Sequence, residues 1–68
     1  MNRVIGSYGY RVITVEDGFK VATFQNCNYN GLGQKVEPRF ENGQVVKVKT
    51  YSTEKKAIAF GEKFLASN

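Results

Sequence analysis

The fold is decided by residues 8–15, which read YGYRVITV. The run is rich in aromatic and β-branched residues, which predicts a β-strand. Successive side chains of a strand point to opposite faces. The run therefore divides into two apolar sets: Tyr8, Tyr10 and Val12 on one face, Ile13 and Val15 on the other. We expect a second layer of the fold to cover one of these faces.

Two turn signals, EDG at 16–18 and ENG at 41–43, predict two β-hairpins. We expect three-residue loops, because that register sets Val15 opposite Phe19 and Val36 opposite Val48. The expected strands span residues 8–15, 19–26, 35–40 and 44–51. Pro38 cannot donate a ladder hydrogen bond, so the third of these is expected to be an edge strand or to be unpaired at that residue.

A C-terminal helix is expected after Ser52, which is a good N-cap. Its apolar arc contains Ala57, Ile58, Phe60, Gly61, Phe64 and Leu65. Gly61 costs a helix about 1 kcal/mol relative to Ala, and we expect a close approach of helix and sheet to compensate. The predicted fold is α+β, a single domain over residues 1–68 in which a four-stranded antiparallel sheet of two hairpins carries the helix on one face.

The predicted register gives the sheet a helix-covered face and an open face. The helix is expected to cover Ile13, Val15, Phe19, Val21, Val36, Val46 and Val48. The open face is expected to carry Tyr8, Tyr10, Val12, Lys20, Phe24, Lys35, Glu37, Arg39, Lys47, Lys49 and Tyr51. It would therefore combine aromatic rings with five cations and a single acid.

Such a face predicts nucleic-acid binding, because rings offer stacking platforms for unpaired bases and cations neutralise phosphates. The net charge of +4 favours an anionic partner in the same sense. Two alternatives stay open. Tyr10, Val12 and Phe24 could form an interface with a second copy or with a host protein. The face could also be an ordinary solvated sheet surface.

The first turn of the helix adds a second basic feature. Lys55 and Lys56 lie where free backbone N–H groups, together with Ser52 and Thr53, would make an anion site. The alternative is that both lysines only add solubility, at a cost of tenths of a kcal/mol.

Composition argues against several function classes. The chain has no histidine and a single cysteine, Cys27, so it lacks the usual general base and the ligands of a structural zinc site. We therefore predict no enzymatic activity, no cofactor and no metal. A lone thiol favours the cytoplasm, and we expect no membrane segment and no signal peptide. The segment NCNYNGLGQ at 26–34 predicts a flexible loop. A chain of 68 residues buries only about 60% of its unfolded surface, so a homodimer could help to stabilise it.

The segment KTYSTEKKAIAFGEKFL at 49–65 resembles the end of small sheet-plus-helix DNA-binding modules, namely AP2 domains and the N-terminal arm-binding domains of tyrosine integrases. In those families a three-stranded sheet enters the major groove and a helix backs it. The resemblance implies that Lys47 and Lys49 face DNA. The chain departs from the pattern in its two predicted hairpins, its Asn-rich loop and its lack of tryptophan. In size and composition the chain is also similar to small accessory proteins of phages and mobile elements, which implies binding to a host complex.

Overall fold

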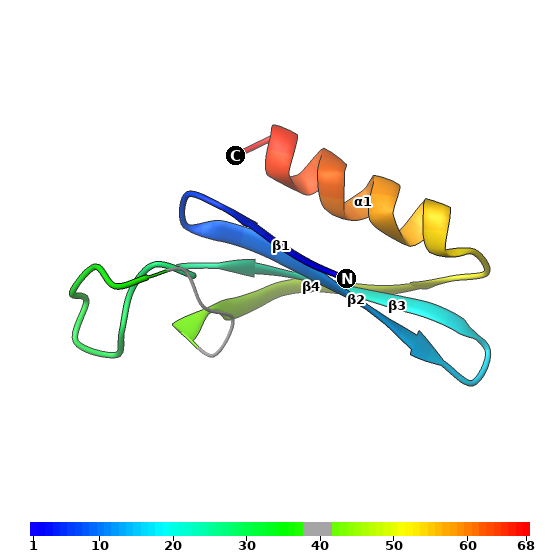
Figure 1. Ribbon diagram of the computed structural model, residues 1–68, viewed down its shortest axis with the longest axis horizontal. Coiled ribbons are helices and arrows are strands. Elements are labelled where there is room, and N and C mark those ends of the chain that lie inside the picture. Colours follow the sequence, from blue (N-terminus) through cyan, green and yellow to red (C-terminus); the bar gives the residue numbers. More distant parts are fainter. Residues whose placement is uncertain (38–41) are drawn as a thin grey trace.

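The computed structural model describes residues 1–37 and 42–68. The elements are, in chain order, β1 (Asn2–Ile5), β2 (Tyr8–Val15), β3 (Gly18–Gln25), β4 (Gln44–Tyr51) and α1 (Glu54–Ala66). The strands form one antiparallel sheet in the order β1-β2-β3-β4, and α1 packs across one of its faces (Figure 1). The predicted class, a four-stranded antiparallel sheet with one C-terminal helix, is confirmed.

The four strands are not the four that the sequence predicted. β1 is an additional strand that pairs with β2, with Ile5 opposite Tyr8. The strand predicted at 35–40 lies partly outside the described residues, at Pro38, Arg39 and Phe40. Over residues 35–37 the structure has an isolated bridge between Lys35 and Tyr29 instead of a strand. The described sheet is therefore a β1-β2-β3 meander with β4 paired to β3, rather than the two hairpins that the sequence predicted.

The β2-β3 hairpin closes one residue earlier than predicted. Val15 pairs with Gly18, one position before its predicted partner Phe19. Side chains alternate along a strand, so this slip turns the whole of β2 over relative to β3. Val12 is consequently buried beneath α1, whereas Ile13 lies on the opposite face and is 47% exposed.

Gly18 is the residue that permits this early closure. Its φ angle is 150°, a conformation that residues with a side chain rarely adopt. A Cβ atom at this position would also collide with the backbone carbonyl oxygen of Tyr51 on β4. Glycine at position 18 therefore lets the end of the hairpin and β4 lie against one another.

The tyrosines of β2 lie beneath the helix, although both were predicted on the open face. Tyr10 is fully buried in the core cluster. Tyr8 packs edge-on against Phe64 of α1, with 6.0 Å between ring centroids. The aromatic rings of β2 thus supply the core instead of an exposed stacking surface.

The side chains of β4 alternate between the same two faces of the sheet. Lys49 pairs with the buried Val21, which places it on the helix side of the sheet, whereas Val48 pairs with Ala22 on the open side and is 46% exposed. The helix-side face carries Tyr8, Tyr10, Val12, Phe19, Val21, Lys47, Lys49 and Tyr51. The open face carries Arg11, Ile13, Val15, Lys20, Ala22, Phe24 and Val48.

The face predictions are therefore wrong for several residues. Helix coverage was predicted for Ile13, Val15 and Val48, which lie on the open face. Val46 falls at a β-bulge and is exposed, and Val36 lies in the loop. The predictions that Phe19 and Val21 lie beneath the helix, and Lys20 and Phe24 opposite it, agree with the structure.

α1 begins one residue later than predicted, because its N-cap is not Ser52. Thr53 is the N-cap, and its Oγ1 accepts a hydrogen bond from the backbone N–H of Lys56 at 3.2 Å. Glu54 in the first turn and Lys63 in the last turn both complement the helix dipole. The predicted apolar arc does face the sheet: Ala57 and Gly61 are buried, and Ile58, Phe60 and Leu65 pack against the core.

The closest approach of α1 to the sheet is at Gly61. A Cβ atom built there would lie 2.5 Å from Cδ1 and 2.7 Å from Cδ2 of Tyr10, closer than real Cβ contacts occur. The ring of Tyr10 thus fills the space that a side chain at position 61 would occupy. This confirms the close approach expected from a glycine in the apolar arc.

A short polar network holds the same contact in place. The Tyr10 hydroxyl donates to Glu62 Oε2 at 2.6 Å, and Arg3 Nη1 donates to Glu62 Oε1 at 2.7 Å. The pKa of Tyr10 is raised to about 12. Burial is the largest cause, and the hydrogen bond to Glu62 and the negative charge of that carboxylate add to it. The network joins β1, β2 and α1.

Replacing Gly61 with alanine should destabilise the protein, although alanine is the better helix former. We expect the free energy of unfolding in urea to fall by about 1–3 kcal/mol, because the added methyl group overpacks against Tyr10. Ala59→Gly, on the exposed side of α1, is the control for helix propensity and should cost about 1 kcal/mol. A more stable Gly61→Ala variant would refute the close contact.

The free energy of unfolding should fall in alkaline solution because of the Tyr10 hydroxyl. The unfolded tyrosine loses its proton near pH 10, while the folded one keeps it to about pH 12. The unfolded state then binds fewer protons, so the free energy of unfolding falls as pH rises through this window. Tyr10→Phe should remove this part of the decline.

The measurement is the difference in unfolding free energy between wild type and variant from pH 8 to about 12. We expect a constant difference below about pH 10 that shrinks above it. A flat difference for Tyr10→Phe would contradict the buried hydrogen bond.

Candidate functional site

A basic groove lies between the helix-side face of β4 and α1. Its volume is about 430 Å³. The described residues that line it are Lys47, Lys49, Tyr51, Phe60, Lys63, Phe64 and Ser67. This set contains three ammonium groups and three aromatic rings, and it contains no carboxylate.

β4 contributes two of the lysines. Lys47 and Lys49 are two positions apart and therefore project from the same face of the strand. Both ammonium groups lie over the ring of Phe60, with Nζ of Lys47 6.0 Å and Nζ of Lys49 5.7 Å from its centroid. These are cation–π distances, and they bring the two positive charges to the same wall of the groove.

α1 contributes the opposite wall through residues spaced three and four apart. Phe60, Lys63, Phe64 and Ser67 fall on one side of the helix at this spacing. Tyr51, at the end of β4, packs against Phe60 with 5.9 Å between ring centroids and 44° between ring planes. The groove is therefore lined on both sides by aromatic rings, with the lysines along its length.

Three of the residues predicted for the site come together in this groove, namely Lys47, Lys49 and Tyr51. Lys56 precedes Phe60 and Lys63 on the same side of α1 by helical spacing. The structure thus gathers part of the predicted basic and aromatic set, but on the helix side of the sheet.

The remaining predicted residues lie elsewhere. Tyr8 and Tyr10 are under the helix, Lys20 and Phe24 are on the open face, Lys35 is in the loop, Lys55 is exposed in the first turn of α1, and Arg39 lies outside the described residues. The anion site at the start of α1 stays a prediction.

Sequence reasoning missed the helical wall of the groove. Phe60 and Phe64 were assigned wholly to the apolar arc, and Lys63 was not predicted as a site residue. The available signal was the spacing of the three residues. Lys63 and Phe64 follow Phe60 by three and four positions, which places all three on one side of the helix. Without the register of β4, nothing in the sequence indicates that this side meets Lys47 and Lys49.

The open face of the sheet is a second surface. It has a shallow hollow of about 180 Å³, lined by Arg11, Ile13, Lys20, Ala22 and Phe24. Ile13 and Val48 are each nearly half exposed, so this surface is more apolar than the groove. It carries fewer lysines than the sequence predicted, because those of β4 point to the other side.

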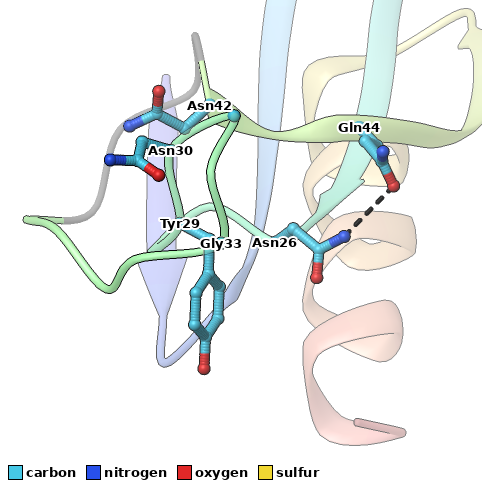
Figure 2. A pocket seen from close by; sticks show the side chains of 7 residues that line it. Asn26, Tyr29, Asn30, Gly33, Asn42 and Gln44 are labelled. Carbon is cyan, nitrogen blue, oxygen red and sulfur yellow. Dashed lines mark hydrogen bonds between the residues drawn. The ribbon is translucent and has the colours of Figure 1, made fainter.

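A third hollow, of about 520 Å³, lies where the Asn-rich loop meets the start of β4 (Figure 2). Its amide groups are largely engaged with one another. Asn30 Oδ1 accepts from the backbone N–H groups of Leu32 and Gln34, and Asn26 donates to Gln44 at 3.1 Å. In Figure 2 the ring of Tyr29 and the amide of Asn30 point in different directions. These contacts order the loop and do not converge on a ligand.

The single thiol of the chain, that of Cys27, lies in the interior. Cys27 is fully buried, and this burial raises the pKa of its thiol, so the nucleophilic thiolate is disfavoured. Within residues 1–37 and 42–68 no group of three or more His, Cys, Asp or Glu could hold a metal ion. No helix in the described parts of the chain has the length and apolar character needed to cross a membrane.

No protein-family model matches the chain, and no curated protein or solved structure matches it. The features that bear on function are therefore the geometry and charge of the groove.

Proposed function

We propose that the protein is a non-enzymatic module that binds nucleic acid in the groove between β4 and α1. The observation that carries this proposal is that Lys47, Lys49 and Lys63 line one groove together with the ring of Phe60. The described lining of this groove contains no acid. The single buried thiol of Cys27 suits a reducing compartment, and we place the function in the cytoplasm.

The lysines suit a phosphate backbone because their charge is not neutralised locally. The described residues that line the groove include no carboxylate, and Glu62, the nearest acid to Lys63 in sequence, is engaged by Tyr10 and Arg3. Binding a phosphate at each lysine releases condensed counterions, which drives association at moderate salt. The four strands contain five cations and no Asp or Glu, so the sheet adds to the positive field.

Binding should therefore weaken steeply with salt. For a single-stranded probe, three lysine–phosphate contacts predict a slope of about −2 in log K against log salt concentration. Fluorescence anisotropy with labelled single-stranded and duplex oligonucleotides measures this slope. We expect Lys47→Glu combined with Lys49→Glu to abolish binding.

The matched control is Lys20→Glu combined with Lys35→Glu, which makes the same change in net charge outside the groove. We expect this control to weaken binding only slightly. Equal losses from the two double variants would show that net charge, not the groove, drives binding. Unchanged binding by the groove variant would overturn the proposal.

A second candidate function is protein binding through the open face, favoured by the exposure of Ile13 and Val48 there. A partner on this face is predicted to be a second copy of the chain. Light scattering should then give about twice the monomer mass of 7.6 kDa, and Ile13→Glu with Val48→Glu should restore the monomer. Leu32→Glu, in the exposed loop, is the control. A monomer at every concentration would exclude this homodimer.

A further inference from the structure

We propose that the groove takes single-stranded nucleic acid, with an unpaired base stacked on Phe60, and that Lys47 and Lys49 cover this ring until phosphates draw them away. This inference rests on the proposed function, since it names the substrate class of the same groove. Its basis is the position of two ammonium groups over one half-buried ring.

The shape of the site favours a single strand over a duplex. Proteins that read duplex DNA insert a convex helix or ribbon into a groove of the nucleic acid. Here Phe60 and the lysines lie in a concave groove between a strand and a helix. The bases of a duplex are stacked on one another, so they have no face to offer to a recessed ring. An unpaired base has such a face, whatever its identity.

The size of the groove agrees with this substrate. Its volume of about 430 Å³ lies within the range of pockets that hold one small ligand, about 300–1,000 Å³. Its rings come from both walls, with Tyr51 tilted against Phe60 and Phe64 one helical turn further on. A base that enters the groove can therefore contact aromatic surface while its phosphates stay near the lysines at the rim.

The positions of Lys47 and Lys49 couple the binding of a phosphate to the stacking of a base on Phe60. The ammonium groups of Lys47 and Lys49 are attracted to the electron-rich face of Phe60. A phosphate is the stronger partner for an ammonium group, because the pair is a charge-assisted hydrogen bond. Binding of phosphate thus moves the lysines off the ring and leaves its face open to the adjoining base. A ligand with phosphates but no bases would draw the lysines away from Phe60, but no base would stack on the exposed face of the ring.

The test compares two oligonucleotides of equal length, one of thymidine and one of abasic residues that keep the sugars and phosphates. Fluorescence anisotropy competition gives both affinities for the wild type, Phe60→Leu and the control Tyr29→Leu, an exposed ring outside the groove. We expect the thymidine strand to bind about 5- to 150-fold more tightly than the abasic strand. Phe60→Leu should remove this difference, and Tyr29→Leu should retain it.

A second readout is the NMR spectrum of ¹³C-labelled phenylalanine rings. The Phe60 resonances should move upfield with the thymidine strand and not with the abasic strand, because only a stacked base adds a ring current. Equal, salt-sensitive binding of both strands would overturn base stacking but leave nucleic-acid binding in place. If neither strand binds, both the stacking and the proposed function are wrong. Tighter binding of a duplex would contradict the single-strand inference alone.

Discussion

The contact between the ring of Tyr10 and the backbone of Gly61 is the constraint on which the rest of the structure depends. The ring fills the space of the missing side chain, and its hydroxyl reaches Glu62, which also holds Arg3 of β1. A slip of β2 by one position would bring the guanidinium of Arg11 beneath the helix in place of this ring. Burying that charge without its own partner costs several kcal/mol, so the register of β2 follows from the contact.

The register of β2 then determines what the groove contains. Val12 pairs with Val21, and Val21 pairs with Lys49 on its other side. Residues paired directly across a sheet share a face, so the lysines of β4 point toward the helix. Their position beside Phe60 is thus a consequence of how the core packs. The alternation that buries the tyrosines also makes the helix-side groove basic, and it leaves Ile13 on the open face.

Local patterns predicted the helix and three of the four described strands, but they predicted the juxtaposition of these elements poorly. The strands at 8–15 and 44–51 and the apolar arc of α1 follow from short-range periodicity, which the sequence displays directly. The EDG turn is compatible with two loop lengths, and the choice between them depends on Tyr10 meeting Gly61, residues far apart in the chain. β1 was missed because a four-residue strand depends on its pairing. Lys47 and Lys49 were predicted as candidate site residues from their own strand. Phe60 and Lys63 lie beside them in the groove only because of the register of β4, which the sequence does not display.

The most direct test of this packing is a nuclear Overhauser measurement between the ring protons of Tyr10 and the α protons of Gly61. We expect strong cross-peaks between them, with the Gly61 α protons shifted by the ring current of Tyr10. We also expect a cross-strand contact between Val12 and Val21. Cross-peaks from Ile13 to the residues of α1, with none from Tyr10, would contradict this packing.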